Sequence, residues 1–227
     1  SGGTGSGKTT MLNALSAFIG YNERVVTIED TRELQLKQRI VIPRVACPPN
    51  SEGKGEFTMH ELLVGALRER PDRIVVGECR DDETYEMLQA MQTGHDGSLT
   101  TTHANNPRAA LDRLQNLVQM SRAGANMPPD AIMKIITEAV DFVVEIKRLP
   151  DGSRRVNSIC EVCGMQGNVP TVGSIMRFQK TGVDSGGRIK GEFRPTGSRI
   201  VSEDHKERFY SNGVEIKSSW FDNGGLW

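Results

Sequence analysis

The chain has 227 residues, and its 28 Lys and Arg residues against 29 Asp and Glu residues give a formal net charge of −1. Hydrophobic residues make up 37% and charged residues 25% of the sequence, which is typical of a globular protein that buries a core. This near-neutral charge argues against a protein that holds nucleic acid through overall basicity. No apolar run reaches the ~18 to 20 residues of a membrane-spanning helix. The four cysteines are too few for a disulfide framework and suggest reduced thiols in a cytoplasm.

The chain opens with a glycine-rich loop, SGGTGSGKT, that leads directly into a segment with apolar residues at helical spacing. We expect this helix to run over residues 8–20, because Gly20 is a typical residue at a helix end. A loop of this kind normally follows a buried strand. Since no residue precedes Ser1, we expect the chain to be truncated at its start, with the first strand of the fold missing.

Strand and helix patterns alternate after this first helix. The expected strands are 24–28, 40–45, 74–76 and 98–102, and the expected further helices are 58–70, 81–94, 107–118 and 129–139. Thr58 and Glu61 form a capping box at the start of one helix, and Pro71 follows its end. Pro43 confines its strand to a sheet edge, because proline cannot donate a ladder hydrogen bond. The alternation predicts an α/β fold with a mostly parallel sheet and helices on both faces.

The pattern changes at residue 141. The segments FVVEIKRL and RRVNSICEV flank a Pro-Asp-Gly-Ser turn at 150–153 and predict a β-hairpin. Residues 172–194 predict a second pair of strands. The last ~30 residues are rich in Gly and Ser without a clear period, so we expect a poorly defined, loosely ordered tail over 198–227.

The opening loop carries the clearest chemistry in the sequence, since Gly2 to Thr9 match G-x-x-x-x-G-K-[ST] completely. In such a loop the backbone N–H groups wrap phosphates, Lys8 reaches the outer phosphates and the Thr9 hydroxyl can bind Mg²⁺. The predicted nucleotide-binding residues are Gly2, Gly3, Thr4, Gly5, Ser6, Gly7, Lys8, Thr9 and Thr10. We therefore predict a RecA-like P-loop NTPase core over 1–140, followed by a β-rich part of the same domain over 141–197.

A P-loop hydrolase also needs an acid for the metal and a group that activates water. Glu29 and Asp30 follow one predicted strand, and Glu78 follows another, in RIVVGE. Glu78 can hold Mg²⁺ through a water molecule, act as a base, or merely cap the next helix, and the sequence does not choose among these roles. The predicted metal ligands are Thr9, Glu29 and Glu78.

Three further groups have both a functional and a structural interpretation. His103 ends a predicted strand; an isolated histidine is more often structural, but its position at the carboxyl edge of the sheet favours contact with the γ-phosphate. Arg39 and Arg44 are the preferred candidates for a cation near that phosphate, although most arginines occupy solvated faces. Cys160 and Cys163 have the spacing of half a zinc site, but no second pair lies nearby, so we predict no metal there.

Four blocks, GGTGSGKTT, TIEDTRELQL, RIVVGECRD and TGHDGSLTTTHANNP, together resemble the secretion ATPase superfamily that powers type II and type IV secretion and type IV pili. In that superfamily they correspond to the Walker A loop, the Asp box, the Walker B segment and the His box. The stretches PPNSEGKGEFTM, QAMQTGHDGSLTT, RLPDGSRRV and FRPTG look most like the tight-adherence branch, which assembles Flp-type pili. The resemblance covers residues 1–197.

The resemblance implies an ATP- and Mg²⁺-dependent ring, usually a homo-hexamer, on the cytoplasmic face of the inner membrane. Its implied partners are an inner-membrane platform protein and, indirectly, pilin or a secreted substrate; nucleic acid is not an expected partner. It further implies that Lys8 and Thr9 hold phosphate and Mg²⁺, that Glu29 activates water, that Glu78 is the Walker B acid, and that His103 is the His-box residue.

Two alternatives remain open. One is a conjugation or effector-export ATPase of the same superfamily, which DNA-stimulated turnover would favour. The other is a nucleotide-binding scaffold that does not hydrolyse, and tight nucleotide binding without phosphate release would identify it.

Overall fold

The structure is a computed structural model that describes residues 1–222, and this part of the chain forms two compact units. We call the first the parallel-sheet unit; it comprises Lys8–Thr102 and Leu111–Ala139. The second, the hairpin unit, comprises Ser1–Gly7, His103–Ala110 and the described residues from Val140 onward. Each unit has its own four-stranded sheet.

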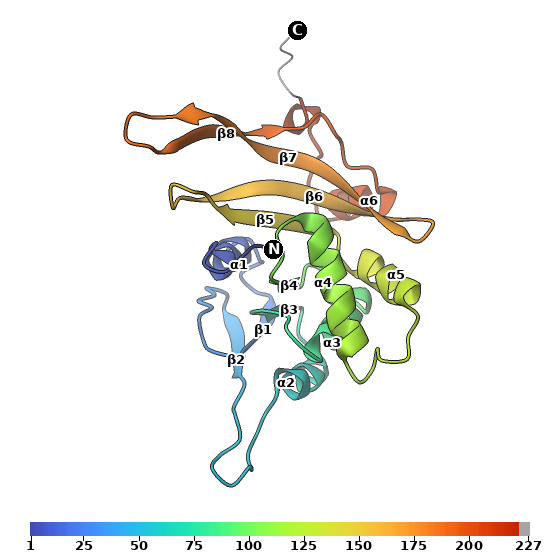
Figure 1. The fold of residues 1–227 in the computed structure, drawn as a ribbon. Coiled ribbons are helices and arrows are strands. Elements are labelled where there is room, and N and C mark those ends of the chain that lie inside the picture. Colours follow the sequence, from blue (N-terminus) through green and yellow to red (C-terminus); the bar gives the residue numbers. More distant parts are fainter. Residues whose placement is uncertain (223–227) are drawn as a thin grey trace. The chain divides into compact units, whose positions relative to one another are not determined.

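The parallel-sheet unit contains β1 (Arg24–Glu29), β2 (Ile40–Val45), β3 (Arg73–Val76) and β4 (Leu99–Thr100), in the spatial order β2-β1-β3-β4 (Figure 1). All neighbouring strands are parallel. The apolar residues of β1 and β3 are fully buried, whereas the edge strand β2 is partly exposed, as its proline predicts. After β1 the chain adds β2 on one side of it and then β3 on the other side. The order of strand addition therefore reverses between β1 and β3, although all the strands run parallel. In open α/β sheets ligands bind at such a switch point, beyond the carboxyl ends of the strands.

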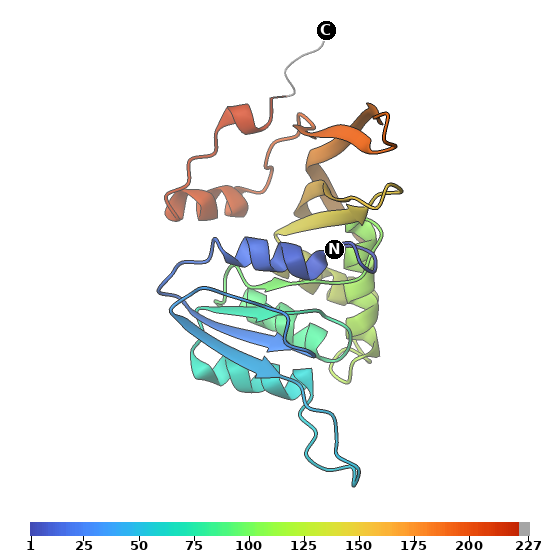
Figure 2. The same cartoon turned by 90° about the vertical axis from the view of Figure 1, so that its left-hand side faces the viewer.

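Helices cover both faces of this sheet. The helices of the chain up to residue 139 are α1 (Lys8–Ser16), α2 (Met59–Ala66), the 3-10 turn η1 (Leu67–Glu69), α3 (Glu83–Gln92), α4 (Pro107–Met120) and α5 (Pro129–Ala139). Figure 2 shows α1 on one face and α2 and α3 on the other. The buried side chain of Leu12 in α1 packs with Val25 and Val75 of the sheet. No helix within the described residues is both long and apolar enough to cross a membrane.

A local sequence signal explains the start of α2, but not the end of α1. The capping box is confirmed, since the Thr58 hydroxyl accepts from the Glu61 N–H and the Glu61 carboxylate accepts from the Thr58 N–H. The first helix ends at Ser16, four residues before the expected Gly20. There the Gln38 side-chain amide donates to the carbonyls of Ser16 and Ile19, so a residue distant in sequence satisfies the last carbonyl groups.

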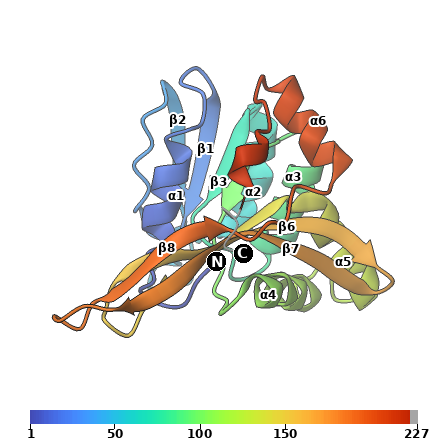
Figure 3. The same cartoon turned by 90° about the horizontal axis from the view of Figure 1, so that it is seen from above.

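The hairpin unit is built on an antiparallel sheet of β5 (Phe142–Arg148), β6 (Arg154–Gln166), β7 (Val169–Val183) and β8 (Ile189–Pro195), in sequential order (Figures 1 and 3). Both predicted strand pairs are confirmed, although β7 begins before the expected residue 172. The Asp151 carboxylate holds the β5–β6 turn, because it accepts from the Ser153 N–H and hydroxyl and from the Ile189 N–H of β8.

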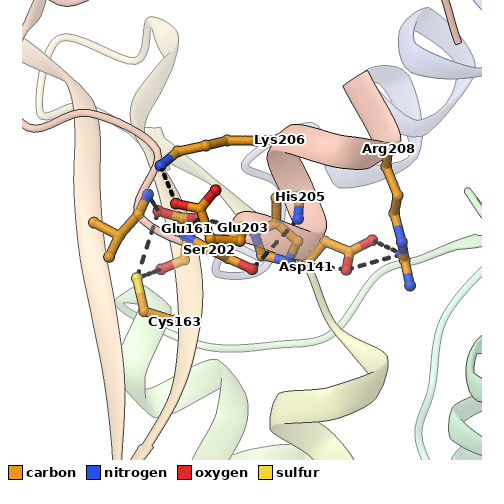
Figure 4. A network of polar contacts seen from close by, with 9 residues as sticks. Asp141, Glu161, Cys163, Ser202, Glu203, His205, Lys206 and Arg208 are labelled. Atoms are coloured by element: carbon orange, nitrogen blue, oxygen red, sulfur yellow. Dashed lines mark hydrogen bonds and ion pairs between the residues drawn. The ribbon is translucent and has the colours of Figure 1, made fainter. Parts of the chain in front are cut away.

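The segment after β8 is not loosely ordered as expected, because it contains α6 (Glu203–Ser211) and the 3-10 turn η2 (Ser218–Trp220). Figure 4 shows how polar contacts anchor α6. The Glu161 carboxylate of β6 accepts from the Ser202 N–H and contacts the His205 ring, whose other nitrogen contacts Asp141. Arg208 also pairs with Asp141. Because these contacts are polar and come from residues distant in the chain, α6 needs no regular apolar period, and its sequence does not predict a helix. The last five residues of the expected tail, 223–227, lie outside the described residues.

Candidate active site

The P-loop adopts a conformation that depends on glycine. Gly5 and Gly7 have φ angles of +68° and +97°, which residues with a Cβ rarely adopt. The Ser6 N–H donates to the Gly3 carbonyl at 3.2 Å and closes a turn. A Cβ at Gly2 would meet the Ser6 hydroxyl and lie 2.6 Å from the Ile146 carbonyl oxygen, so the loop also needs glycine there for close packing.

The first seven residues of the loop belong to the hairpin unit and contact its strands β5 and β6. The Ser1 backbone nitrogen donates to the Val144 carbonyl at 2.7 Å, the Ile146 N–H donates to the Ser1 carbonyl at 2.9 Å, and Gly2 pairs in parallel with Ile146. Further along the loop, the Arg154 Nε donates to the Gly5 carbonyl at 2.8 Å. The sequence did not point to Arg154, and its only local signal is its place directly after the Pro-Asp-Gly-Ser turn.

The remaining predicted nucleotide-binding residues, Lys8, Thr9 and Thr10, open α1 in the parallel-sheet unit. Burial lowers the pKa of the Lys8 ammonium; the nearby Glu78 carboxylate opposes this shift, and the Arg80 guanidinium adds to it. Glu78 therefore lies within electrostatic range of Lys8. Thr9 is half-buried and Thr10 is exposed. The first N–H groups of α1 have no carbonyl partner within the helix and suit an anion.

Glu29, at the carboxyl end of β1, is a buried carboxylate that is only half satisfied. It is 3% exposed. Its Oε1 accepts from the N–H groups of Glu33 at 2.8 Å and Leu34 at 2.7 Å, whereas its Oε2 has no hydrogen-bond partner among the described residues. A Cβ at Gly77 would lie 3.3 Å from the Glu29 Cγ, so glycine at this position leaves room for the carboxylate. Leaving a buried carboxylate oxygen unpaired costs stability, which points to a functional role.

Glu78 lies at the same edge of the sheet as Glu29. β3 runs parallel to β1, and the Gly77 N–H donates to the Ile28 carbonyl at 2.8 Å, which brings the ends of the two strands together. The Glu78 side chain is 15% exposed and its Oε2 is 2.9 Å from the Arg80 Nη2. The same guanidinium lies 3.6 Å from Asp30, which is itself 66% exposed. Hydrogen bonding to Glu78 raises the pKa of Arg80.

In the structure, Glu83 accepts hydrogen bonds in the turn before α3, where the helix-cap interpretation of Glu78 would place that residue. The backbone N–H groups of Arg80 and Asp81, ahead of α3, donate to the Glu83 carboxylate at 2.6 and 2.9 Å. Glu83 is 4% exposed, and its carboxylate holds the turn that leads into α3, whose N-cap residue Asp82 makes no side-chain capping hydrogen bond. The turn before α3 is therefore held by a carboxylate other than that of Glu78.

His103 is exposed and belongs to the hairpin unit, while Glu29 and Glu78 belong to the parallel-sheet unit. Its contact with the γ-phosphate therefore stays a prediction. The residues before it are tied to the end of β3, since the Thr101 hydroxyl donates to the Gly77 carbonyl at 2.8 Å and the Cys79 N–H donates to the Thr101 carbonyl at 2.9 Å.

The two arginine candidates differ in their surroundings. Arg44 forms an ion pair with Glu69 at 2.5 Å, which gives its charge a structural role. Arg39 is exposed, and within residues 1–222 its guanidinium makes no ion pair. A cavity of about 440 Å³ lies near both, lined by residues that include Arg32, Leu34 and Pro43, but by none of the predicted site residues.

Cys160 and Cys163 lie in different surroundings. Cys160 is buried, whereas Cys163 is half-buried and contacts the Glu161 carboxylate. Across the described part of the chain, no group of three or more His, Cys, Asp or Glu side chains is arranged to hold a metal ion.

Comparison with known proteins identifies the family. Residues 1–203 match the family described as Type II/IV secretion system protein. The chain belongs to this family. It is 39% identical over 158 residues to the type IV secretion system protein VirB11 of Bartonella quintana, and the match covers 70% of this chain and 44% of that protein. It is 40% identical over 146 residues to VirB11 of Agrobacterium fabrum, with coverages of 64% and 42%.

A solved member of the type II/IV secretion family has the same fold. The crystal structure of the VirB11 ATPase from the Brucella suis type IV secretion system, in complex with sulphate, superimposes with a TM-score of 0.64 and 32% sequence identity. The match covers 70% of this chain and 46% of that one, so the chain spans less than half the length of these relatives. The predicted α/β fold with a parallel sheet and the resemblance to the secretion superfamily are confirmed at this level.

Proposed function

We propose that this protein hydrolyses ATP with Mg²⁺ and is a motor of a type II/IV secretion machinery. The observation that carries the proposal is the Glu29 carboxylate, buried beside Glu78 at the switch point of the sheet with one oxygen unpaired. The P-loop motif that opens α1 and the similarity to VirB11 proteins of type IV secretion systems support it.

The residues present fit a nucleotide and its metal ion. The glycine conformations of the P-loop leave backbone N–H groups available to phosphate oxygens, and the lowered pKa of Lys8 indicates a desolvated cation that a phosphate would compensate. The oxygen atoms of Thr9, Glu29 and Glu78 suit Mg²⁺. When bound, this ion neutralises phosphate charge and aligns the reacting oxygens.

In the hydrolysis we propose, a water oxygen attacks the γ-phosphorus and the bond from that phosphorus to the ADP oxygen breaks. Glu29 accepts the water proton on Oε2, while the N–H groups of Glu33 and Leu34 hold Oε1 and so fix the carboxylate. Glu78 would hold Mg²⁺ through a water molecule. We further propose that His103 contacts the γ-phosphate and that Arg39, rather than the ion-paired Arg44, supplies mobile positive charge.

The proposal extends to assembly and location. The NTPase core over 1–140, its β-rich extension over 141–197 and the tail over 198–227 would form part of each subunit of a homo-hexamer. This ring would be peripheral on the cytoplasmic face of the inner membrane and bind a platform protein there.

Two clients remain as proposals. The relative named as the type IV secretion system protein VirB11 favours secretion through a type IV system, with conjugation as an alternative within the same superfamily. The segments PPNSEGKGEFTM and RLPDGSRRV favour assembly of a Flp-type pilus, as in the tight-adherence branch.

The test is ATP turnover by the full-length protein. We expect phosphate release by the wild type and none by Glu78→Gln, which should still bind ATP. Glu56→Gln, which removes an exposed carboxylate from the segment between β2 and α2, is the matched control and should leave turnover unchanged. Tight ATP binding without phosphate release by the wild type would instead identify a nucleotide-binding scaffold.

A further inference from the structure

The P-loop is held by two strands of one hairpin. Ser1 and Gly2 pair with β5, as described above, and Arg154, the first residue of β6, contacts the loop at Gly5. The two strands are joined by the turn that Asp151 holds, so both contacts with the P-loop come from one hairpin. All of these residues belong to the hairpin unit.

The Arg154 side chain approaches the P-loop at two residues, Gly5 and Gly7. Its Nε donates to the Gly5 carbonyl at 2.8 Å, and its Cδ lies 3.3 Å from the position that a Cβ would occupy at Gly7. Its terminal Nη groups make no hydrogen bond or ion pair within the described residues. The guanidinium is therefore oriented by one bond to the loop and still has donors and a full charge available.

The position of this bond matters because of peptide geometry. The peptide unit between Gly5 and Ser6 is planar and trans, so its carbonyl and its N–H point in opposite directions. The carbonyl accepts from Arg154, and the N–H points back into the loop, where it donates to the Gly3 carbonyl. A cationic donor on the carbonyl also polarises the peptide and makes its N–H a stronger donor.

We propose that Arg154 is a positioning residue of the nucleotide site. It fixes the Gly5–Ser6 peptide so that the loop presents its N–H groups to the phosphates, and its charge strengthens phosphate binding. This inference rests on the proposed nucleotide hydrolysis and adds to it a residue from outside the predicted motifs.

The experiment measures the affinity of the full-length protein for a fluorescent ADP analogue, together with the KM and kcat for ATP. We expect Arg154→Ala to weaken ADP binding and raise KM about tenfold, the loss typical of one charged hydrogen bond. We expect kcat to stay nearly unchanged, because the lost contact acts on bound substrate and transition state alike. Arg154→Lys keeps the charge but lacks the Nε donor, so its loss should be intermediate.

Arg155→Ala is the matched control. Arg155 is the next residue, is also exposed, and lies opposite Lys147 in the strand register, so its side chain points to the other face of the sheet. We expect no change in ADP affinity. As a second readout, amide hydrogen exchange over residues 3–8 without nucleotide should be faster in Arg154→Ala than in Arg155→Ala.

The outcomes separate this inference from the proposed function. If the wild type binds and hydrolyses ATP but the Arg154→Ala and Arg155→Ala variants have equal ADP affinity, the role of Arg154 is refuted and the proposed function stands. If the wild type binds no nucleotide, the proposed function and this inference both fail. A loss of kcat alone, with unchanged ADP affinity and KM, would also contradict the role stated here.

Discussion

Glu29 of the parallel-sheet unit and Glu161 of the hairpin unit are both strand carboxylates that are almost completely buried, with exposed fractions of 3% and 1%. Only Glu161 has both oxygens in hydrogen bonds. Its Oε1 accepts from the Ser202 N–H at 3.0 Å and lies 2.8 Å from the His205 Nδ1, and its Oε2 accepts from the Val201 N–H at 2.8 Å. Burial raises the pKa of Glu161, but these hydrogen bonds outweigh it and the net shift is downward.

The difference separates a structural carboxylate from a candidate functional one. Both oxygens of Glu161 accept hydrogen bonds from residues in or directly before α6, and Oε2 also contacts Cys163 (Figure 4), so neither oxygen is left for a ligand. Glu29 uses one oxygen to hold the loop after β1 and keeps the other unpaired. Burial alone therefore does not distinguish the two acids; the unpaired oxygen of Glu29 does.

The largest expected effect is that of Glu29→Gln on turnover. Loss of a general base lowers kcat by about a thousandfold, and we expect thermal stability to change little because the amide oxygen can still accept from the Glu33 and Leu34 N–H groups. Phosphate release and thermal melting of the full-length protein measure the two effects. A variant that keeps the wild-type kcat would remove the proposed distinction between Glu29 and Glu161.

Glu161→Gln should show the opposite pattern. It replaces an anion that contacts the His205 ring and two backbone N–H groups, and we expect a loss of about 3 kcal/mol in the free energy of unfolding. The kcat of the folded protein should not change. Urea denaturation measures the loss, and Glu203→Gln, at an exposed position in α6, is the control. A reduced kcat without any loss of stability would mean that Glu161 is not purely structural.

The His205 contacts predict a smaller, pH-dependent effect. Burial lowers the pKa of His205, but contacts with Asp141 and Glu161 outweigh it and raise the pKa above the ordinary value of 6.5. The extra stability is therefore fully present below pH 6.5 and is lost as the pH rises through the raised value. Arg208 also pairs with Asp141, at 3.0 Å. Unfolding free energies between about pH 5 and 9 should show this fall, and His205→Gln should flatten the curve.

The smallest effect is expected at Asp151. Hydrogen bonds from the Ile189 N–H and from Ser153 lower the pKa of this carboxyl to about 2, so its contribution to stability is present above its unfolded value and is lost only as the pH falls toward 2. Asp151→Ala should accelerate amide exchange at Ile189 several-fold and weaken ADP binding less than Arg154→Ala does. An ADP affinity as low as that of Arg154→Ala would show that the turn, rather than the arginine, positions the P-loop.

The elements with strong local signals could be predicted from the sequence. The buried runs of β1 and β3, the capping box of α2 and the turn between β5 and β6 each depend on neighbouring residues and are present as expected. The α6 helix was missed because its stability comes from Glu161 and Asp141, which lie far from it in the chain. The early end of α1 has the same cause, since Gln38 caps it from 22 residues away.

By itself the sequence determined the P-loop motif, the acids at the ends of two parallel strands and the family to which these blocks belong, because each depends on residue type and short-range spacing. Only the tertiary structure decided which polar atoms are already satisfied. It pairs Arg44 with Glu69, holds the turn before α3 through Glu83, leaves the Glu29 Oε2 unpaired and brings Arg154 to the P-loop across 149 residues. The physical reason is that hydrogen bonding and burial depend on which residues meet in space, and strand pairing brings together residues whose separation in the chain carries no local signal.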